Sequence, residues 1–175
     1  MSFATSLMAP SPNPTAPPWG DGTATFSPDR PVYRLLLIED NPVDAMRIRQ
    51  LLARCRTAQF MVESTSTLAV ATERLASGGI DVVLLDLDLP DSLGLDTYAI
   101  LACTNPHVPV LILSGAGGEM AAFGAVRLGA QDVLVKANLN ADSLARTTRC
   151  ALERQQLLSS LRGLSLTDEL TGLLN

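Results

Sequence analysis

Four short apolar runs of the sequence each end in a side chain that could handle a phosphoryl group. These side chains are Glu39, Asp40, Asp86, Ser114 and Lys136. The run that ends in Asp86 reads DVVLLD, so an apolar segment leads directly into negative charge. Lys136 is the single lysine among the 13 arginine and lysine residues, which suggests a role that arginine would fill poorly.

The acidic members of this set would need a cation if they came together. If the runs are neighbouring parallel strands, Glu39, Asp40 and Asp86 converge at one sheet edge. Each pair of ionised carboxylates would then repel by roughly 4 kcal/mol at about 4 Å and an effective dielectric of about 20. Lys136 supplies one positive charge, and Mg²⁺, which prefers oxygen ligands, would supply two. The sequence therefore predicts a Mg²⁺ site.

An aspartate beside Mg²⁺, a hydroxyl and an ammonium could accept a phosphoryl group. The carboxylate of Asp86 could act as the nucleophile and form an acyl phosphate, because the metal and Lys136 neutralise charge on the transferred oxygens. Ser114 would donate a hydrogen bond to one phosphoryl oxygen, while Lys136 would pair with another as a compact point charge. Three further acids are expected to be ordinary turn, cap and first-turn helix residues. They are, in that order, Asp91, Asp96 and Asp44.

The segments between the apolar runs have helical periodicity. Strands are expected at 32–38, 59–63, 80–86, 108–114 and 131–135, and helices at 41–55, 67–79, 94–103, 118–129 and from 141 onward. The first helix should have Asn41 as its N-cap and Pro42 at its first position. Five strand–helix units predict an α/β fold with a doubly wound, five-stranded parallel sheet in the flavodoxin-like order 2-1-3-4-5, ending in an extended C-terminal helix.

Composition limits the class of protein. The chain has 175 residues, 47% of them hydrophobic, and a net charge of -5, which fits one globular domain and argues against nucleic-acid binding. No apolar run is long enough to span a membrane. The scattered Cys55, Cys103 and Cys150 suggest core thiols in a reducing cytoplasm. Residues 1–31 hold seven of the eleven prolines and are expected to form a disordered leader without an export signal.

Several segments resemble the receiver domain of bacterial response regulators. They are LLLIEDNPVDA, VVLLDLDLPDSLGLD, VLILSG and GAQDVLVK, within residues 32–155, with a domain core at 32–140. The resemblance implies that Asp86 is the phospho-acceptor of a cytoplasmic regulatory domain that is not itself an enzyme. A histidine kinase or phosphotransferase would be the donor. Mg²⁺ would bind Glu39, Asp40, Asp86 and the backbone carbonyl of Asp88, and Ser114 and Lys136 would detect the phosphorylated state.

Three positions depart from the family's pattern. Val133 stands where the family usually has a tyrosine or phenylalanine that rotates inward on activation. Ala137 stands where a proline with a cis peptide bond often follows the lysine, and a cis Lys-Ala bond costs about 3 kcal/mol. Asp88 adds negative charge near the acceptor, which could change metal affinity or the lifetime of the phosphoryl group.

The C-terminal helix, expected at 141–165, is longer than a closing helix needs. Leu144, Ala151 and Leu158 recur every seven residues, and Leu161 continues the apolar stripe. The stripe could pack on the sheet or pair with a second copy of the chain. Both are compatible if one half of the helix packs on the sheet and the other half pairs with the second copy. A homodimer through the fourth and fifth helices is expected.

The final segment, 166–175, contains DELTGLLN, which is similar to the start of the GGDEF domain of diguanylate cyclases. This similarity implies a receiver that regulates an attached cyclase, whose catalytic loop, nucleotide pocket and metal site are missing from this chain. The other interpretation is a leucine-rich helix end closed by Gly172.

Two other functions remain open. A haloacid-dehalogenase-like phosphohydrolase also uses an aspartate nucleophile in an Asp-x-Asp pattern, matched by Asp86 and Asp88. However, its metal-binding acidic motif follows the lysine, whereas Glu39 and Asp40 precede the nucleophile. The second alternative is a receiver-like interaction module that works without phosphorylation, which Val133 and Ala137 make conceivable.

Overall fold

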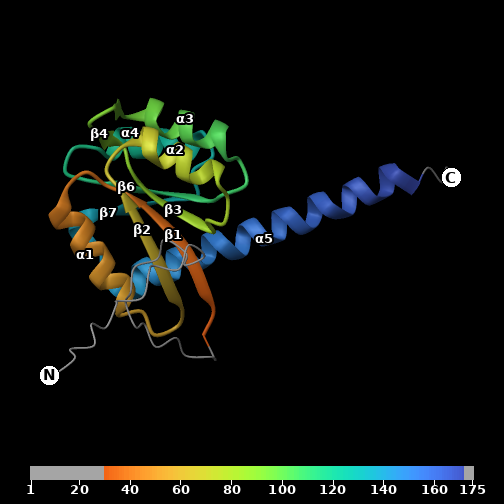
Figure 1. The fold of residues 1–175 in the computed structure, drawn as a ribbon, viewed down its shortest axis with the longest axis horizontal. Coiled ribbons are helices and arrows are strands. Elements are labelled where there is room, and N and C mark those ends of the chain that lie inside the picture. The colour runs from red at the N-terminus through yellow and green to blue at the C-terminus, as the bar shows by residue number, and fades with distance from the viewer. Residues whose placement is uncertain (1–29, 172–175) are drawn as a thin grey trace, which may run out of the picture.

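The structure, a computed structural model, describes the backbone of residues 30–171 and the side chains of residues 30–161. Its main feature is a parallel sheet of five strands in the order β2-β1-β3-β6-β7 (Figure 1). The strands are β1 (Val32–Ile38), β2 (Gln59–Thr65), β3 (Val82–Asp86), β6 (Val110–Ser114) and β7 (Asp132–Val135). This arrangement confirms the predicted fold and the predicted strand order 2-1-3-4-5.

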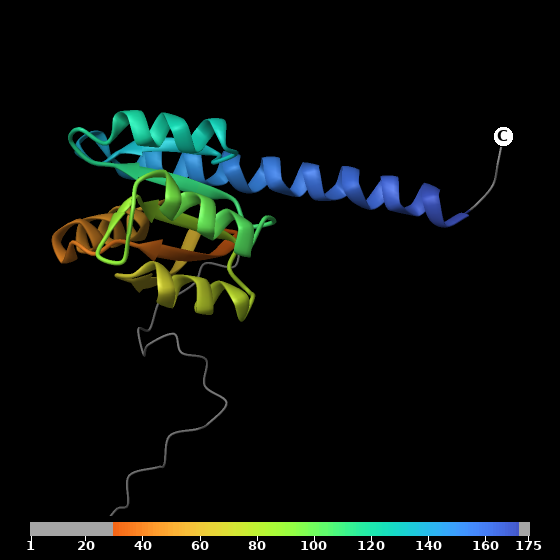
Figure 2. The same cartoon turned by 90° about the horizontal axis from the view of Figure 1, so that it is seen from above.

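Helices cover both faces of the sheet, as Figures 1 and 2 show. They are α1 (Pro42–Ala53), α2 (Leu68–Ala76), α3 (Leu95–Thr104), α4 (Glu119–Arg127) and α5 (Ala141–Thr171). The buried side chains form one core beneath α2, α3 and α4 and another beneath α1 and α5. Along β3, Val83 and Leu85 enter the first core while Val82 and Leu84 enter the second, which is the two-residue alternation of a strand.

The first helix begins as expected. The Asn41 side chain accepts a hydrogen bond from the backbone N–H of Val43 at 2.9 Å, and Pro42 occupies the first turn. This N-cap satisfies a backbone donor that the helix leaves without a partner. The cap also fixes where α1 starts, two residues after the acidic pair that follows β1.

A small antiparallel hairpin, formed by β4 (Asp88–Leu89) and β5 (Ser92–Leu93), was not predicted. It begins at Asp88, two residues after Asp86. The Thr97 hydroxyl, which is fully buried, donates to the Leu87 carbonyl at 3.0 Å and lies 2.9 Å from Ser92 Oγ. These contacts tie the hairpin to α3.

The turn of this hairpin also caps α2. The Asp91 carboxylate accepts hydrogen bonds from the backbone N–H groups of Ala69 and Leu68, both at 2.9 Å, and these bonds lower the pKa of the Asp91 carboxyl. Asp91 is thus a turn residue as predicted, with an additional long-range role. The prediction for Asp96 is wrong, because Gly94, with φ of 63°, is the N-cap of α3 and Asp96 lies in the first turn.

The cysteine prediction is correct for one residue of three. Cys55 is buried, whereas Cys103 and Cys150 are exposed. Both exposed thiols are on helices, α3 and α5, and periodicity alone did not place them on the solvent side.

The two halves of α5 differ in burial. Leu144, Ala151 and Leu152 are at most 5% exposed and pack on the sheet, whereas Leu158 and Leu161 are 39% and 63% exposed. The second half projects away from the domain in both views (Figures 1 and 2). Packing on the sheet therefore holds for the first half of the stripe.

Two expectations fall on segments that the structure does not describe. Most of the predicted leader and the Gly172 helix stop lie outside the described residues. Within the described part of the chain, none of the helices combines the length and apolarity needed to cross a bilayer.

We predict that Thr97→Val lowers the free energy of unfolding by about 1 kcal/mol, because it removes a buried hydroxyl while keeping the side-chain shape. Urea denaturation measures the change. Thr104→Val is the matched control, since the Thr104 hydroxyl bonds the Ile100 carbonyl in an exposed position of the same helix. Equal losses in the two variants would contradict the role assigned to Thr97.

Candidate functional site

The carboxyl ends of β1 and β3 bring three acids together. β1 and β3 are neighbours in the sheet, with Ile38 opposite Leu85, so the residues that follow lie side by side. Glu39, Asp40 and Asp86 each present a carboxylate oxygen, and these oxygens all lie within 4.8 Å of one another. Glu39 and Asp86 are buried while Asp40 is exposed, so the cluster is open to solvent on one side.

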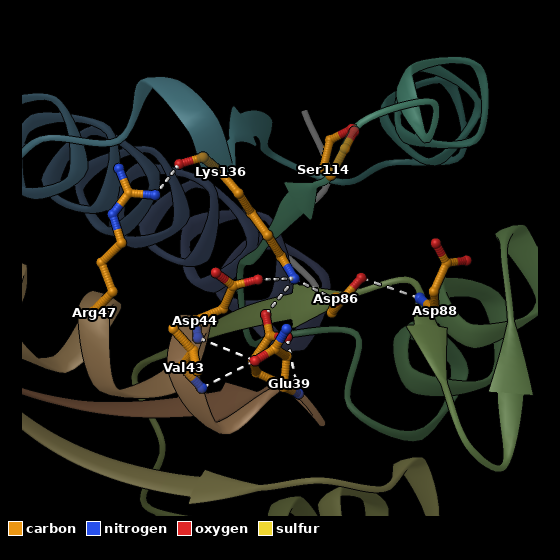
Figure 3. Close-up of polar contacts among 10 residues, drawn as sticks. Glu39, Val43, Asp44, Arg47, Asp86, Asp88, Ser114 and Lys136 are labelled. Carbon is orange, nitrogen blue, oxygen red and sulfur yellow. Dashed lines mark hydrogen bonds and ion pairs between the residues drawn. The ribbon is translucent and has the colours of Figure 1, made fainter.

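Lys136 reaches this cluster from the end of β7 (Figure 3). Its Nζ lies 2.5 Å from Asp86 Oδ2 and 2.6 Å from Glu39 Oε2. Burial alone would lower the pKa of Lys136, but the hydrogen bonds and charges of Asp86 and Glu39 outweigh it and raise the pKa above its usual value. The side chain is therefore an ammonium at physiological pH.

Glu39 is the most confined of the acids, with no exposed side-chain surface. Its Oε1 accepts the backbone N–H of Asn41 at 3.2 Å. Its buried Oε2 faces the Lys136 ammonium at 2.6 Å. Burial and the charge of Asp86 raise the pKa of Glu39 to about 7, against the opposing effect of Lys136.

These groups fit a hard divalent cation. The donors are carboxylate oxygens that lie within 4.8 Å of one another, and Mg²⁺ prefers such ligands. Among the described residues, Lys136 is the one basic side chain in an ion pair with Glu39, Asp86 or Asp44, whose Oδ2 is 3.3 Å from Lys136 Nζ. Negative charge therefore exceeds positive charge here. A cation would reduce that imbalance and favour the ionised form of Glu39.

The remaining expected site residues lie around Asp86. The backbone N–H of Asp88 donates to Asp86 Oδ1 at 3.1 Å, and the exposed Asp88 side chain points away from the cluster in Figure 3. Ser114 ends β6 beside Asp86, since the sheet pairs Asp86 with Leu113. Its buried hydroxyl donates to the Gly115 carbonyl at 3.3 Å, so in this structure it bonds its own loop.

Sequence analysis missed two residues of α1 that contact Lys136. Asp44 is a first-turn residue as predicted, but its ion pair with Lys136 was not anticipated. Arg47, one turn later, donates to the Lys136 backbone carbonyl at 2.8 Å. The signal that could have found them is their spacing, because residues three apart on a helix share a face.

The two departures near Lys136 have simple structural outcomes. Val133 is partly buried and packs against the core beneath α2, α3 and α4. No cis peptide bond occurs within residues 30–171, so the Lys136–Ala137 bond is trans.

Comparison with known proteins gives the family. The model of the response regulator receiver domain matches residues 35–148, more than half of the chain. The chain is 34% identical over 140 residues to protein-glutamate methylesterase/protein-glutamine glutaminase 2 of Anaeromyxobacter dehalogenans (strain 2CP-C), covering 77% of this chain and 38% of that protein. It is 31% identical over 103 residues to the transcriptional regulatory protein BasR of Escherichia coli (strain K12), covering 59% and 45%. The chain thus spans less than half the length of these curated relatives.

The fold comparison agrees. A crystal structure of a response regulator receiver domain protein from Clostridium thermocellum superposes with a TM-score of 0.64 at 27% identity, covering 72% of this chain and 98% of that one. The signal receiver domain of a LuxO repressor protein from Vibrio parahaemolyticus gives 0.63 at 26% identity, covering 75% and 97%. The chain therefore belongs to the response regulator receiver domain family and is mainly a receiver domain, a regulatory rather than a catalytic module.

Proposed function

We propose that this chain is a cytoplasmic phosphorelay receiver that accepts a phosphoryl group on Asp86. The observation that carries the proposal is the position of the Asp86 carboxylate, in contact with Lys136 and within 4.8 Å of oxygens of Glu39 and Asp40. The donor is a phosphohistidine of a histidine kinase or phosphotransferase. An Asp86 carboxylate oxygen forms a bond to phosphorus while the P–N bond breaks, and the imidazole leaves as the phosphoryl group arrives.

Each neighbouring group has a proposed role. Glu39, Asp40, Asp86 and the Asp88 carbonyl hold Mg²⁺, which supplies charge neutralisation at the transferred phosphoryl oxygens when bound. The Lys136 ammonium shifts from the carboxylates to one phosphoryl oxygen. The Ser114 hydroxyl leaves the Gly115 carbonyl and donates to another oxygen.

The switch is proposed to work without an aromatic side chain. Val133 has no ring to rotate, so the change passes through the segment after β6, which follows Ser114, or through helix packing. That segment contains Gly117 with φ of 89°, a conformation that favours glycine, and leads into α4. When the Ser114 hydroxyl moves to the phosphoryl group, it shifts this segment and so repositions α4. On α4, Met120 and Phe123 are 85% and 63% exposed.

We propose that the output passes through α5 to an attached diguanylate cyclase domain. The similarity of residues 168–175 to the start of a GGDEF domain supports this, as does the continuation of α5 to Thr171. Phosphorylation promotes a homodimer through α4 and α5, in which the exposed Leu158 and Leu161 of one copy meet those of its partner. Such a dimer would bring two output domains together.

One alternative keeps a supporting observation. Val133 and the trans Lys136–Ala137 bond suit an interaction module that never takes a phosphoryl group. The phosphohydrolase alternative has no such support, since the acidic pair Glu39 and Asp40 precedes Asp86 in the chain and the chain belongs to the receiver family.

Phosphorylation of Asp86 can be tested directly. Incubation with Mg²⁺ and acetyl phosphate should add one phosphoryl group to the wild-type chain, seen by intact mass spectrometry, and none to Asp86→Asn. Asp88→Asn is the matched control, because it removes a neighbouring exposed carboxylate and keeps the backbone carbonyl; it should still be modified. No gain in the wild-type chain would favour the phosphorylation-independent module.

Mg²⁺ binding should depend on pH through Glu39. With a pKa of about 7, the Glu39 carboxyl is mostly protonated at pH 6 and mostly ionised at pH 8, and only the ionised form is a good ligand. We expect Mg²⁺ affinity to rise about tenfold from pH 6 to pH 8 in calorimetric titrations. Glu39→Gln should bind more weakly and lose most of this dependence. A wild-type affinity that is equal at both pH values would contradict the role of Glu39.

The dimer can be tested by sedimentation velocity. The wild-type chain treated with acetyl phosphate should sediment as a dimer, and Leu158→Glu should remain monomeric because it places charge in the apolar stripe. Ser160→Glu, two residues further on and on another face of α5, should dimerise like the wild type. Equal behaviour of the two variants would show that the stripe is not the interface.

A further inference from the structure

The turn that carries Lys136 is weakly held by its own backbone. Lys136 opens a single 3₁₀ turn, η1 (Lys136–Asn138), directly after β7. The hydrogen bond that closes the turn, from the Leu139 N–H to the Lys136 carbonyl, is 3.4 Å long. Ala137 brings no ring to restrict the backbone. The position of the Lys136 side chain must therefore depend on contacts from elsewhere.

Arg47 supplies such contacts from α1. Its Nη1 donates to the Lys136 carbonyl at 2.8 Å and its Nη2 reaches the Leu139 carbonyl at 3.4 Å, so one guanidinium spans both ends of the turn. Figure 3 shows Arg47 extending from α1 to the Lys136 carbonyl. A planar guanidinium suits this task because its donors point in fixed directions.

The helix that carries Arg47 is itself fixed relative to the acids. α1 begins at Pro42, two residues after Asp40, with its N-cap at Asn41, and packs on the sheet through Ile48 and Leu52. One turn before Arg47, the Asp44 carboxylate contacts the Lys136 ammonium. α1 thus contacts Lys136 at its backbone and at its side-chain tip.

We propose that Arg47 is a positioning residue that holds the 136–139 turn so that the Lys136 ammonium reaches Asp86. The inference rests on the proposed phosphoryl acceptance by Asp86. Arg47 touches neither the acids nor the transferred group in this role, and it acts only through Lys136. Arg47 thereby restrains the backbone of a turn in which Ala137 has no ring to do so.

The test is the initial rate of phosphorylation by acetyl phosphate with saturating Mg²⁺, followed by intact mass spectrometry. Arg47→Ala should slow the rate about tenfold, because small misplacements of a charged group are costly in a transition state. Arg49→Ala is the matched control, since Arg49 lies on the same helix but bonds Ser64 Oγ at 2.8 Å instead. It should react at the wild-type rate.

A double-mutant cycle separates positioning from a general structural effect. In a Lys136→Ala background, Arg47→Ala should cause no further loss, because the group that it positions is gone. A loss of the same factor in both backgrounds, or an equal loss in Arg49→Ala, overturns the inference. Should Arg47→Ala not fold, Arg47→Lys takes its place, since one ammonium cannot span two carbonyls; a wild-type rate for it would also overturn the inference.

The outcome for the wild-type chain keeps the two proposals distinct. If the wild-type chain gains no phosphoryl group, the proposed function fails and this inference fails with it. If the wild-type chain is modified and Arg47→Ala reacts equally fast, only the role of Arg47 is wrong.

Discussion

Mutual repulsion among carboxylates is the constraint around which this domain is organised. Glu39, Asp40 and Asp86 are brought within a few ångströms by adjacent strands, and two of them are buried. Such a cluster is unfavourable unless positive charge is close, because desolvated like charges repel strongly. Lys136 supplies part of that charge, but it is one ammonium facing several carboxylates, and burial together with the charge of Asp86 raises the pKa of Glu39. An incompletely compensated cluster is poised to take a cation and a charged group.

The rest of the fold keeps these charges in place. The sheet order sets β1 beside β3, while β7, which leads to Lys136, lies at the sheet edge next to β6. Lys136 must therefore extend across the ends of the strands to reach the acids, and α1 borders its path through Asp44 and Arg47. On the other side of Asp86, the β4–β5 hairpin is tied to α3 by Thr97 and to α2 by Asp91. The acceptor thus lies between two anchored segments.

The sheet and most of the site could be predicted because their signals are local. The apolar runs have the length and patterning of buried strands, and parallel strands deliver their terminal residues to one edge. The hairpin after Asp86 could not be predicted, because two-residue strands carry no periodicity. The ion pair of Asp44 with Lys136 joins residues 92 positions apart, and such contacts depend on packing that no local pattern encodes. The exposure of Cys103 depends in the same way on how α3 is rotated against the sheet.

The length of α5 has a mechanical consequence. Leu152 is the last buried residue among the α5 side chains that the structure describes, and the helix continues from there to Thr171, a distance of about 28 Å at the usual rise per residue. A rod anchored at one end converts a small angular change at its root into a larger translation at its tip. A tilt of about 5° would displace the far end by about 2.5 Å over that length. Sub-ångström adjustments in the sheet can thus displace the far end of α5 by a distance comparable to the length of a side-chain contact.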